Sequence, residues 1–281
     1  MFIHWFPGHM TKAIRAMRKD MAIVNSVIYV IDSRAPKACI NPTFDEIIGN
    51  KPRLYVLNKA DLVPKEELDK WLAYFKEQPN SGCIWANSTK NTNSAVFINA
   101  LKTLNEEKIV RFKNRGVKKT IRAMVIGVPN CGKSTLINSL IAKKKTITGN
   151  RPGVTRSMQW VSIDQYIDLV DTPGTLYPDF SDQEKATYLA MIGSINDDIL
   201  DITELAAETI KYLCDNNYKE AFKLRYNLQE IRENSLDNLT AIAKQKGFLL
   251  KGGQYDLERA SKAVVNDFRK QAFGKIILEK I

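Results

Sequence analysis

A glycine-bounded turn followed by a lysine and a serine stands at residues 127–134, GVPNCGKS. Gly127 and Gly132 permit backbone conformations that a side chain would obstruct, so the amide groups between them can point at one anion. Lys133 would then reach the outer phosphates of a nucleotide, and the Ser134 hydroxyl is a suitable ligand for Mg²⁺. The segment therefore predicts a phosphate-binding loop whose contacts are made by Asn130, Cys131, Gly132, Lys133, Ser134 and Thr135.

Groups that could complete a magnesium site follow this loop. In DTPG, residues 171–174, Asp171 ends an apolar run and could hold a Mg²⁺-bound water. The backbone amide of Gly174 could contact a terminal phosphate. Between the loop and DTPG lies NRPGVTRS, where the Thr155 hydroxyl could bind the metal. Lys133 and Thr155 are accordingly predicted to act in catalysis.

A segment that could read a base precedes the phosphate loop. In NKAD, residues 58–61, the Asp61 carboxylate could accept hydrogen bonds from guanine N1–H and N2–H, donors that adenine lacks. Asn58 and Lys59 would brace the base and the neighbouring loops. The predicted base-binding residues are therefore Asn58, Lys59, Ala60 and Asp61, joined after the next apolar run by Asn87 and Ser88.

The elements that must position these residues read as alternating strands and helices, which is typical of the α/β class. Short apolar runs that end in polar turns predict the strands: NSVIYVID, PRLYVLNKAD, GCIWANS, TIRAMVIG, MQWVSI and QYIDLVDTPG. The segment at residues 66–78 is expected to be a helix, as is the one that follows the phosphate loop. Ligands bind at the carboxyl ends of strands in doubly wound sheets, so the motifs should meet at one edge.

The order of the motifs along the chain is unusual. In most GTPases the phosphate loop comes first, whereas here NKAD precedes it. A parallel sheet depends on which strands are adjacent, while the loops that join them can be rewired at the surface. This order results if the two termini of a GTPase with the usual order are joined through the basic segment at residues 106–123 and new termini are made by cutting the chain after the DTPG strand. We therefore expect one guanine-nucleotide site in a circularly permuted P-loop GTPase domain at residues 1–180.

The sequence resembles the circularly permuted GTPases, and among them the ribosome biogenesis GTPase A family. Motifs of that family occur over essentially the whole chain and in its order: HWFPGHM, DSRAP, NKAD, GVPNCGKSTLIN, RPGVT and DTPG. The resemblance implies that the chain hydrolyses GTP during late maturation of the bacterial large (50S) ribosomal subunit. It also implies GTP-dependent binding to ribosomal RNA, activation by the ribosomal particle, and release after hydrolysis.

The resemblance further implies stimulation by K⁺. Asn130 matches the phosphate-loop asparagine that such GTPases use as a ligand for the monovalent cation. Judged by its residue type alone, Asn130 could equally be a turn residue that bonds its own backbone.

Two stretches depart from the family's pattern. Thr175 stands after DTPG where the family has a large aliphatic residue, and it is too short to orient water as the glutamine of Ras-like relatives does. The stretch NSTKNTNSA lacks a glycine that often follows this base-contacting segment. His9 is the family's proposed substitute for the glutamine, because an imidazole can orient or polarise water. The alternative is a structural histidine in the PGHM turn, the role we expect for His4.

Residues 181–281 are expected to form an all-α, RNA-binding domain. Three helical segments carry capping residue types near their starts: Thr203, Ser235 and Asp256. In the last segment Arg259, Lys262 and Arg269 lie beside an apolar stripe, a pattern that is usually just a solvated helix face. The net charge and the family resemblance together favour contact of these three residues with rRNA phosphates. The segment after DTPG, which would move when the γ-phosphate is lost, leads into this domain.

Charge and composition narrow the class of protein. A formal net charge of +11 over 281 residues favours polyanionic partners such as nucleic acid. No apolar run reaches the roughly 18 to 20 residues of a membrane helix. The four scattered cysteines lack metal-ligand spacing and fit a reducing cytoplasm.

These observations leave one leading interpretation and three alternatives. We expect a cytoplasmic monomer that uses Mg²⁺ and K⁺ and binds the large ribosomal subunit through its rRNA. Ribosomal proteins are possible further contacts, and no membrane partner is expected. The alternatives are a nucleotide-gated RNA-binding module, a GTPase of RNA modification, and a membrane-associated GTPase.

Overall fold

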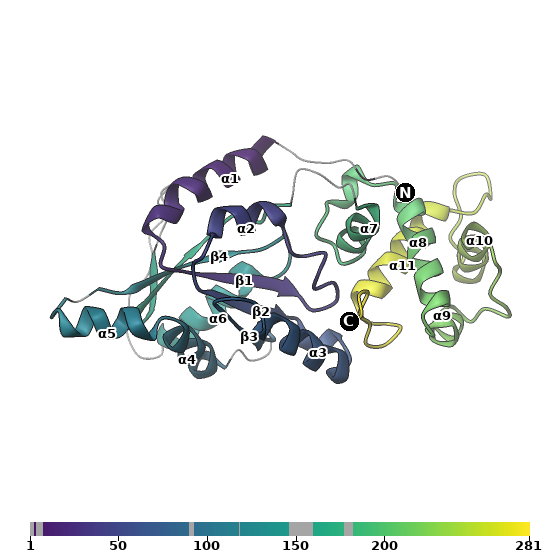
Figure 1. Cartoon of the computed structure of the whole chain (residues 1–281). Coiled ribbons are helices and arrows are strands. Elements are labelled where there is room, and N and C mark those ends of the chain that lie inside the picture. The colour runs from purple at the N-terminus through teal and green to yellow at the C-terminus, as the bar shows by residue number, and fades with distance from the viewer. Residues whose placement is uncertain (1–2, 4–7, 90–92, 118, 146–159, 177–181) are drawn as a thin grey trace. The chain divides into compact units, whose positions relative to one another are not determined.

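The chain folds into two compact units (Figure 1). The computed structural model describes every residue except 1–2, 4–7, 90–92, 118, 146–159 and 177–181. The α/β unit comprises residues 6–178 and 279–281, and the helical unit comprises residues 1–5 and 179–278. None of the helices in the described ranges is long and apolar enough to cross a membrane.

The α/β unit is built on one sheet, which has six strands within the described residues, in the order β3-β2-β1-β4-β6-β5. The strands are β1 (Ser26–Asp32), β2 (Arg53–Asn58), β3 (Ser81–Trp85), β4 (Ile121–Ile126), β5 (Val161–Asp164) and β6 (Ile167–Asp171). All neighbours are parallel except β5 and β6, which are antiparallel. The prediction of a doubly wound α/β sheet is therefore confirmed.

Helices cover both faces of this sheet, which explains why its central strands are apolar throughout. Every residue of β1 is buried. Helices α1 (Gly8–Asp20) and α2 (Pro42–Ile48) run along one side of the sheet and α4 (Ser94–Leu104) along the other (Figure 1). This unit also contains α3 (Lys65–Lys76), α5 (Glu106–Asn114) and α6 (Lys133–Lys145).

The circular permutation is visible at the seam between β1 and β4. These strands pair in parallel, with Tyr29 opposite Ile126, although a long stretch of chain separates them. On the other side of β1, Asp32 lies opposite Asn58 at the carboxyl ends of β1 and β2. The base-reading strands and the phosphate-binding strand therefore end at the same edge of one sheet, as the order of motifs predicts.

The end of the chain also belongs to the α/β unit. The carboxylate of Glu279 accepts hydrogen bonds from the backbone amides of Lys37 and Ala38, at 2.7 and 3.0 Å. The indole nitrogen of Trp71 donates to the Glu279 carbonyl oxygen at 3.2 Å. These contacts hold the last residues against the loop that follows β1.

The helical unit consists of amphipathic helices around a separate apolar core. Its helices are α7 (Gln183–Met191), α8 (Ile202–Asp215), α9 (Lys219–Tyr226), α10 (Ser235–Lys246) and α11 (Leu257–Arg269). Helix α11 packs against α8 and α10, burying Val264 and Phe268. The three segments that the sequence predicted to be helical are α8, α10 and α11.

Two of the three predicted helix caps are wrong. The Asp201 carboxylate caps α8 by accepting from the amides of Thr203 and Glu204, at 2.9 and 3.0 Å. Asn234 caps α10, whereas Ser235 is its first helical residue. Asp256 caps α11 as predicted. In both failures a better or equal capping side chain stands one or two residues earlier.

One of the three basic residues expected to face RNA, Arg269, is used inside the helical unit, whereas Arg259 and Lys262 are exposed on α11. The guanidinium of Arg269 donates to the carbonyl oxygens of Ala190 and Met191 and to the carboxylate of Asp197. Lys262 forms an ion pair with Glu258, and Arg259 lies over the Phe248 ring. Because helical spacing does not reveal what packs against a face, the internal role of Arg269 was hidden from the sequence pattern.

Candidate nucleotide-binding site

The phosphate loop follows β4 and depends on two glycines with positive φ. Gly127 has a φ of 148°, and a Cβ there would lie 2.4 Å from the Val30 carbonyl oxygen. Gly132 has a φ of 99°, and a Cβ there would lie 2.2 Å from the Asn58 amide nitrogen. Side chains are excluded at both positions because the loop is clamped against β1 and NKAD.

Lys133 lies folded over this loop at the start of α6. It is only 6% exposed, and its ammonium group donates to the carbonyl oxygens of Gly127 and Val128, at 3.1 and 2.9 Å. Gly174 approaches from the segment after β6, and a Cβ there would lie 2.8 Å from the Lys133 ammonium nitrogen. The Gly174 backbone and the lysine therefore meet over the loop, as contacts to a terminal phosphate require.

Ser134 and Asp171 form a set of oxygen donors that suits Mg²⁺. The Ser134 hydroxyl donates to an Asp171 carboxylate oxygen at 2.8 Å, so the two predicted metal-binding groups are adjacent. Mg²⁺ prefers hard oxygen ligands and usually keeps waters and substrate phosphates in its coordination shell. A bound Mg²⁺ would supply charge neutralisation for the nucleotide phosphates.

Asn58 ties the base-reading segment to the phosphate loop. Its side-chain amide donates to the Cys131 carbonyl oxygen at 2.8 Å. Its side-chain oxygen accepts from the Ser88 amide and hydroxyl, at 3.2 and 2.7 Å. One buried asparagine therefore joins three segments, and its predicted contact with the base stays a prediction.

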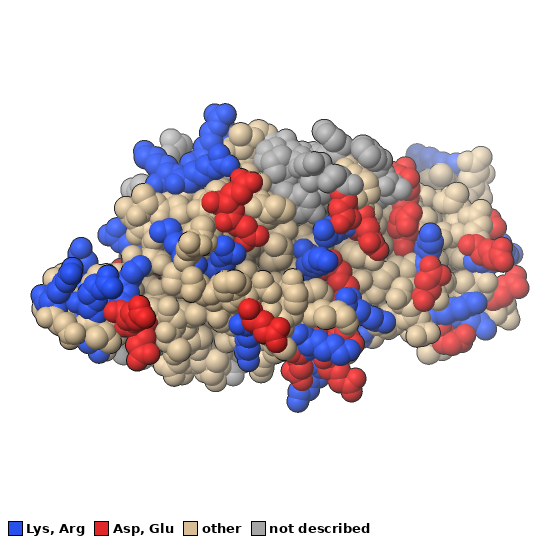
Figure 2. Space-filling view, in the orientation of Figure 1, with Lys and Arg blue, Asp and Glu red and all other residues tan. Residues whose placement is uncertain are grey.

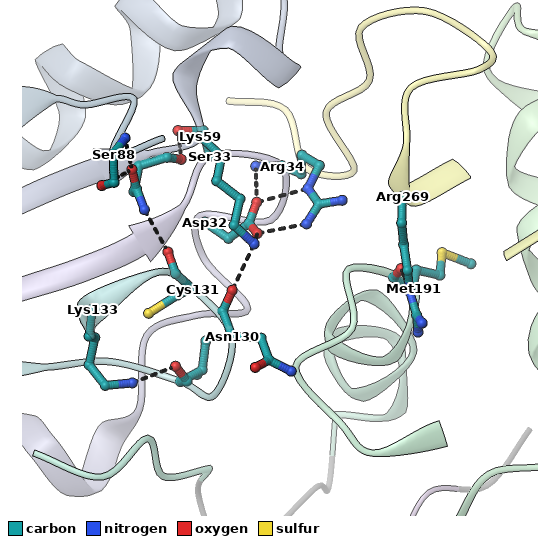
Figure 3. A network of polar contacts seen from close by, with 12 residues as sticks. Asp32, Ser33, Arg34, Lys59, Ser88, Asn130, Cys131, Lys133, Met191 and Arg269 are labelled. Carbon is teal, nitrogen blue, oxygen red and sulfur yellow. Dashed lines mark hydrogen bonds and ion pairs between the residues drawn. The ribbon is translucent and has the colours of Figure 1, made fainter. Parts of the chain in front are cut away.

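Lys59 makes a second tie to the phosphate loop. Its ammonium group donates to the Asn130 carbonyl oxygen at 2.7 Å. Figure 3 shows the Lys59 ammonium group directed at the Asn130 backbone. Both residues have positive φ, 57° for Lys59 and 56° for Asn130. Conformations of this kind in non-glycine residues persist where the surrounding contacts enforce them.

A buried carboxylate that the site prediction missed holds Lys59 in place. Asp32, at the end of β1, accepts from the Arg34 guanidinium at 2.9 and 2.7 Å and pairs with Lys59 at 2.8 Å. Burial alone would raise the pKa of Asp32, but the charges and hydrogen bonds of Arg34 and Lys59 outweigh it and lower that pKa to about 2. The DSRAP motif, which begins with Asp32, was the sequence signal that could have identified this residue as part of the site.

These contacts frame a cleft of about 490 Å³ at the carboxyl edge of the sheet. The predicted residues that line it are Asn58, Lys59, Asp61, Asn87, Ser88, Asn130, Gly132, Lys133, Ser134 and Thr135. Leu62 and Thr89 also line it and were not predicted. The structure therefore brings the NKAD, Asn87-Ser88 and phosphate-loop segments to one concave surface.

Four predicted site residues do not line the cleft. Ala60 and Cys131 are buried, with the Ala60 amide donating to Ala86. Asp171 accepts a hydrogen bond from Ser134, and Gly174 lies against Lys133. Thr155 lies outside the described residues, as does the side chain of His9, whose backbone is in the first turn of α1.

Thr175 is fully buried, and its hydroxyl has no hydrogen-bond partner among the described residues. Its amide donates to the Gly127 carbonyl oxygen at 3.4 Å. The residue therefore packs beneath the phosphate loop, which agrees with the expectation that it cannot orient an attacking water.

Fold and cleft together define a P-loop GTPase with its base-reading and phosphate-binding motifs in permuted order. A family model described as 50S ribosome-binding GTPase matches residues 122–244. Ribosome biogenesis GTPase A of Bacillus cereus is 40% identical over 99% of this chain and 94% of its own length. Mitochondrial ribosome-associated GTPase 1 of Bos taurus is 30% identical over 98% of this chain and 88% of its own length.

Solved structures agree with this placement. The GNP-bound structure of YlqF from Thermotoga maritima covers 96% of this chain and 98% of that one, with a TM-score of 0.65 and 25% identity. The chain belongs to the ribosome biogenesis GTPase A family of circularly permuted GTPases.

Proposed function

We propose that GTP binding and hydrolysis by this chain control late maturation of the large (50S) ribosomal subunit. The GTP-bound form binds the particle and its rRNA, and hydrolysis releases it. The observation that carries the proposal is the single cleft in which Asp61 of NKAD and Lys133 of the phosphate loop both lie. The relatives' names connect this type of site to ribosome biogenesis and to association with ribosomes, and such a role would place the protein in the cytoplasm as a monomer.

Sedimentation with ribosomal fractions tests the proposal directly. Protein loaded with a non-hydrolysable GTP analogue is expected to sediment with large subunits and with their precursors, and GDP-loaded protein is expected to stay in the supernatant. Lys133→Ala, which removes the ammonium group over the loop, should lose turnover and serves as the nucleotide-site control. Equal sedimentation with small and large subunits would contradict the assignment to the large subunit.

The cation requirements follow from the donors around the loop. Ser134 and Asp171, with Thr155, are proposed to hold Mg²⁺, and Asn130 is proposed to help bind K⁺. Support for this role comes from the position of Asn130, which lines the nucleotide cleft together with Lys133 and Ser134. Turnover in KCl should exceed that in NaCl, and equal rates would leave Asn130 as a turn residue.

Activation by the ribosomal particle is proposed to involve His9. Support comes from Thr175, which is buried and therefore removed from the water-positioning role. His9→Ala should leave GTP affinity nearly unchanged and reduce particle-stimulated turnover by roughly 10²-fold, the scale of a lost acid–base or positioning group. Single-turnover hydrolysis with saturating particles measures this, and a rate equal to that of the unmodified protein would return His9 to a structural role.

A further inference from the structure

The positive charge of the chain is distributed unevenly between its two units. The α/β unit contains 28 Lys and Arg against 15 Asp and Glu, a net charge of +13. The helical unit contains 14 against 16, a net charge of −2. Attraction to a phosphate backbone scales with the cationic groups that can neutralise phosphates. The excess charge that first suggested a nucleic-acid partner therefore resides in the α/β unit.

Helix α1 carries part of this positive charge on its exposed face. Met10, Ile14 and Met17 form its buried stripe, and the outer face carries the exposed residues Lys12, Arg15 and Lys19. These three residues repeat at helical spacing, and within the described part of the chain no carboxylate lies at ion-pair distance from them. Figure 2 shows the Lys and Arg side chains gathered over α1.

Helix α5 presents a second basic face. All nine of its residues are described, and none of them is buried. A helix of this length is marginal in water without an apolar face packed on a core. Acidic residues occupy its first turn, and Arg111, Lys113 and Arg115 are exposed at and just beyond its last turn. Figure 2 shows a second group of basic side chains over α5.

Basic side chains gather around α5, in a groove that Glu106 and Glu107 of its first turn also line. Lys108 lies in a groove of about 440 Å³ that Arg111 also lines. Burial, and then the positive charges of Lys51 and Arg111, lower the pKa of Lys108. Like charges held together in this way repel each other, and the phosphates of a polyanion would relieve that repulsion.

We propose that the outer faces of α1 and α5 form the main phosphate-binding surface for structured RNA. We call this surface, defined by Lys12, Arg15, Lys19, Lys108, Arg111 and Arg115, the basic face. The proposal rests on the proposed ribosomal function and specifies where the RNA is held: by the GTP-binding unit itself. The helical unit, with balanced charge, contributes little to the electrostatic attraction.

Two charge-neutralised variants of the full-length protein test the placement. Both lose the same number of positive charges, so a difference between them reports position and not net charge. The basic-face variant carries Lys12→Gln, Lys19→Gln, Arg111→Gln and Arg115→Gln. The control carries substitutions of exposed lysines of the helical unit: Lys211→Gln, Lys219→Gln, Lys244→Gln and Lys251→Gln.

Binding is measured to RNA extracted from large subunits, over a series of KCl concentrations, with the protein loaded with a non-hydrolysable GTP analogue. The basic-face variant should bind about tenfold or more weakly, with a salt slope flatter by about 2 to 4. The control should stay within about threefold of the unmodified protein. Equal losses in both variants, or no loss in the basic-face variant, would overturn the proposal.

Further measurements test the electrostatic argument, the choice of RNA as the partner, and the proposed function separately. A variant that preserves charge, with Lys12→Arg, Lys19→Arg, Arg111→Lys and Arg115→Lys, should bind RNA normally, and its failure would overturn the electrostatic argument. Tighter binding of the unmodified protein to phosphatidylglycerol vesicles than to RNA would overturn the choice of partner. Failure of the unmodified protein to sediment with large subunits would contradict the proposed function, whereas insensitivity to the basic-face substitutions contradicts only this inference.

Discussion

At the scale of single residues, the site is a set of short ties between loops. Asn58 and Lys59 bond the carbonyl oxygens of Cys131 and Asn130, and Asp32 anchors Lys59 from behind. Hydrogen bonds that involve a charged group contribute about 1.5 to 3 kcal/mol each. Loss of one such tie is therefore expected to change nucleotide binding measurably without unfolding the sheet.

Asp61→Asn is expected to change which base is bound. Asp61 lines the cleft, and its carboxylate would accept from two guanine nitrogens. Replacing the carboxylate with an amide should weaken GTP binding by about 10- to 100-fold, the equivalent of one charged hydrogen bond, and improve binding of xanthosine triphosphate. Titration with both nucleotides measures this, and Asp69→Asn, an exposed acid outside the cleft, is the matched control. Unchanged base preference would contradict the assignment of Asp61.

Asp32→Asn is expected to weaken GTP binding by acting through Lys59. The amide cannot neutralise Lys59 and Arg34, so the lysine loses its anchor. We expect about a tenfold loss of GTP affinity, within the range for a hydrogen bond between charged groups. In a Lys59→Ala background the same substitution should have little further effect on GTP affinity. Additive losses in this double-mutant cycle would mean that Asp32 acts on the fold and not on Lys59.

The same carboxylate predicts a pH dependence of stability. Its pKa is lowered in the folded protein to about 2, so its contribution is present above the pKa of an unfolded aspartate, about 4. That contribution is lost as the pH falls from about 4 towards 2. The difference in unfolding free energy between the unmodified protein and Asp32→Asn should therefore be larger at pH 7 than at pH 3. A difference that grows on acidification would contradict the ion-pair argument.

At the scale of elements, turns and caps determine where strands and helices begin and end. The phosphate loop connects β4 to α6 through two positive-φ glycines, and α8 begins at a carboxylate cap. Both features are local backbone conformations, but their contacts differ. The loop is pressed against another strand's end, whereas the cap involves only its own helix.

Gly132→Ala is expected to abolish the tie between the loop and NKAD. The added Cβ would lie 2.2 Å from the Asn58 amide nitrogen, and the alanine backbone would have to adopt a φ of +99°. We expect a loss of GTP affinity of more than about tenfold, because the clamp to Cys131 is a buried hydrogen bond. Gly252→Ala is the matched control, since Gly252 has a φ of +100° with nothing within 4 Å. Equal GTP affinity in both variants would contradict the steric argument.

Asp201→Ala is expected to destabilise the helical unit by about 1 kcal/mol, the usual loss for a helix cap. The variant leaves the amides of Thr203 and Glu204 without their acceptor. Thr203→Ala should have a smaller effect, because only the backbone of that residue takes part in the cap. Denaturant unfolding followed by circular dichroism measures both. If Thr203→Ala lowered the free energy of unfolding more than Asp201→Ala, Thr203 would be the cap of α8, as the sequence predicted.

At the scale of the whole molecule, two units with separate cores imply two unfolding transitions. The residues that line the nucleotide cleft all belong to the α/β unit. GDP with Mg²⁺ at about 100 times its dissociation constant should stabilise that unit by about 2.7 kcal/mol and leave the other transition unchanged. Scanning calorimetry with and without GDP measures this. A single transition that shifts as a whole would contradict independent unfolding.

The sequence by itself determined the class of protein and predicted most of the residues that line the candidate cleft. GVPNCGKS, NKAD and DTPG each encode a local conformation and its chemistry within a few adjacent residues. Their order established the permutation, because a parallel sheet fixes where strand ends meet but not the order in which the chain visits them. The apolar runs before them predicted the strands for the same local reason.

Only the tertiary structure decided which groups from distant segments meet. The pairing of Asp32 with Lys59 depends on the register of β1 against β2, which no spacing along the chain contains. Arg269 had the spacing of a surface residue, yet its guanidinium bonds Asp197 within the helical unit. Helix α5 had the pattern of a connecting segment and became an exposed basic face. Burial and pairing are properties of neighbours in space, and neighbours are fixed only when the elements pack.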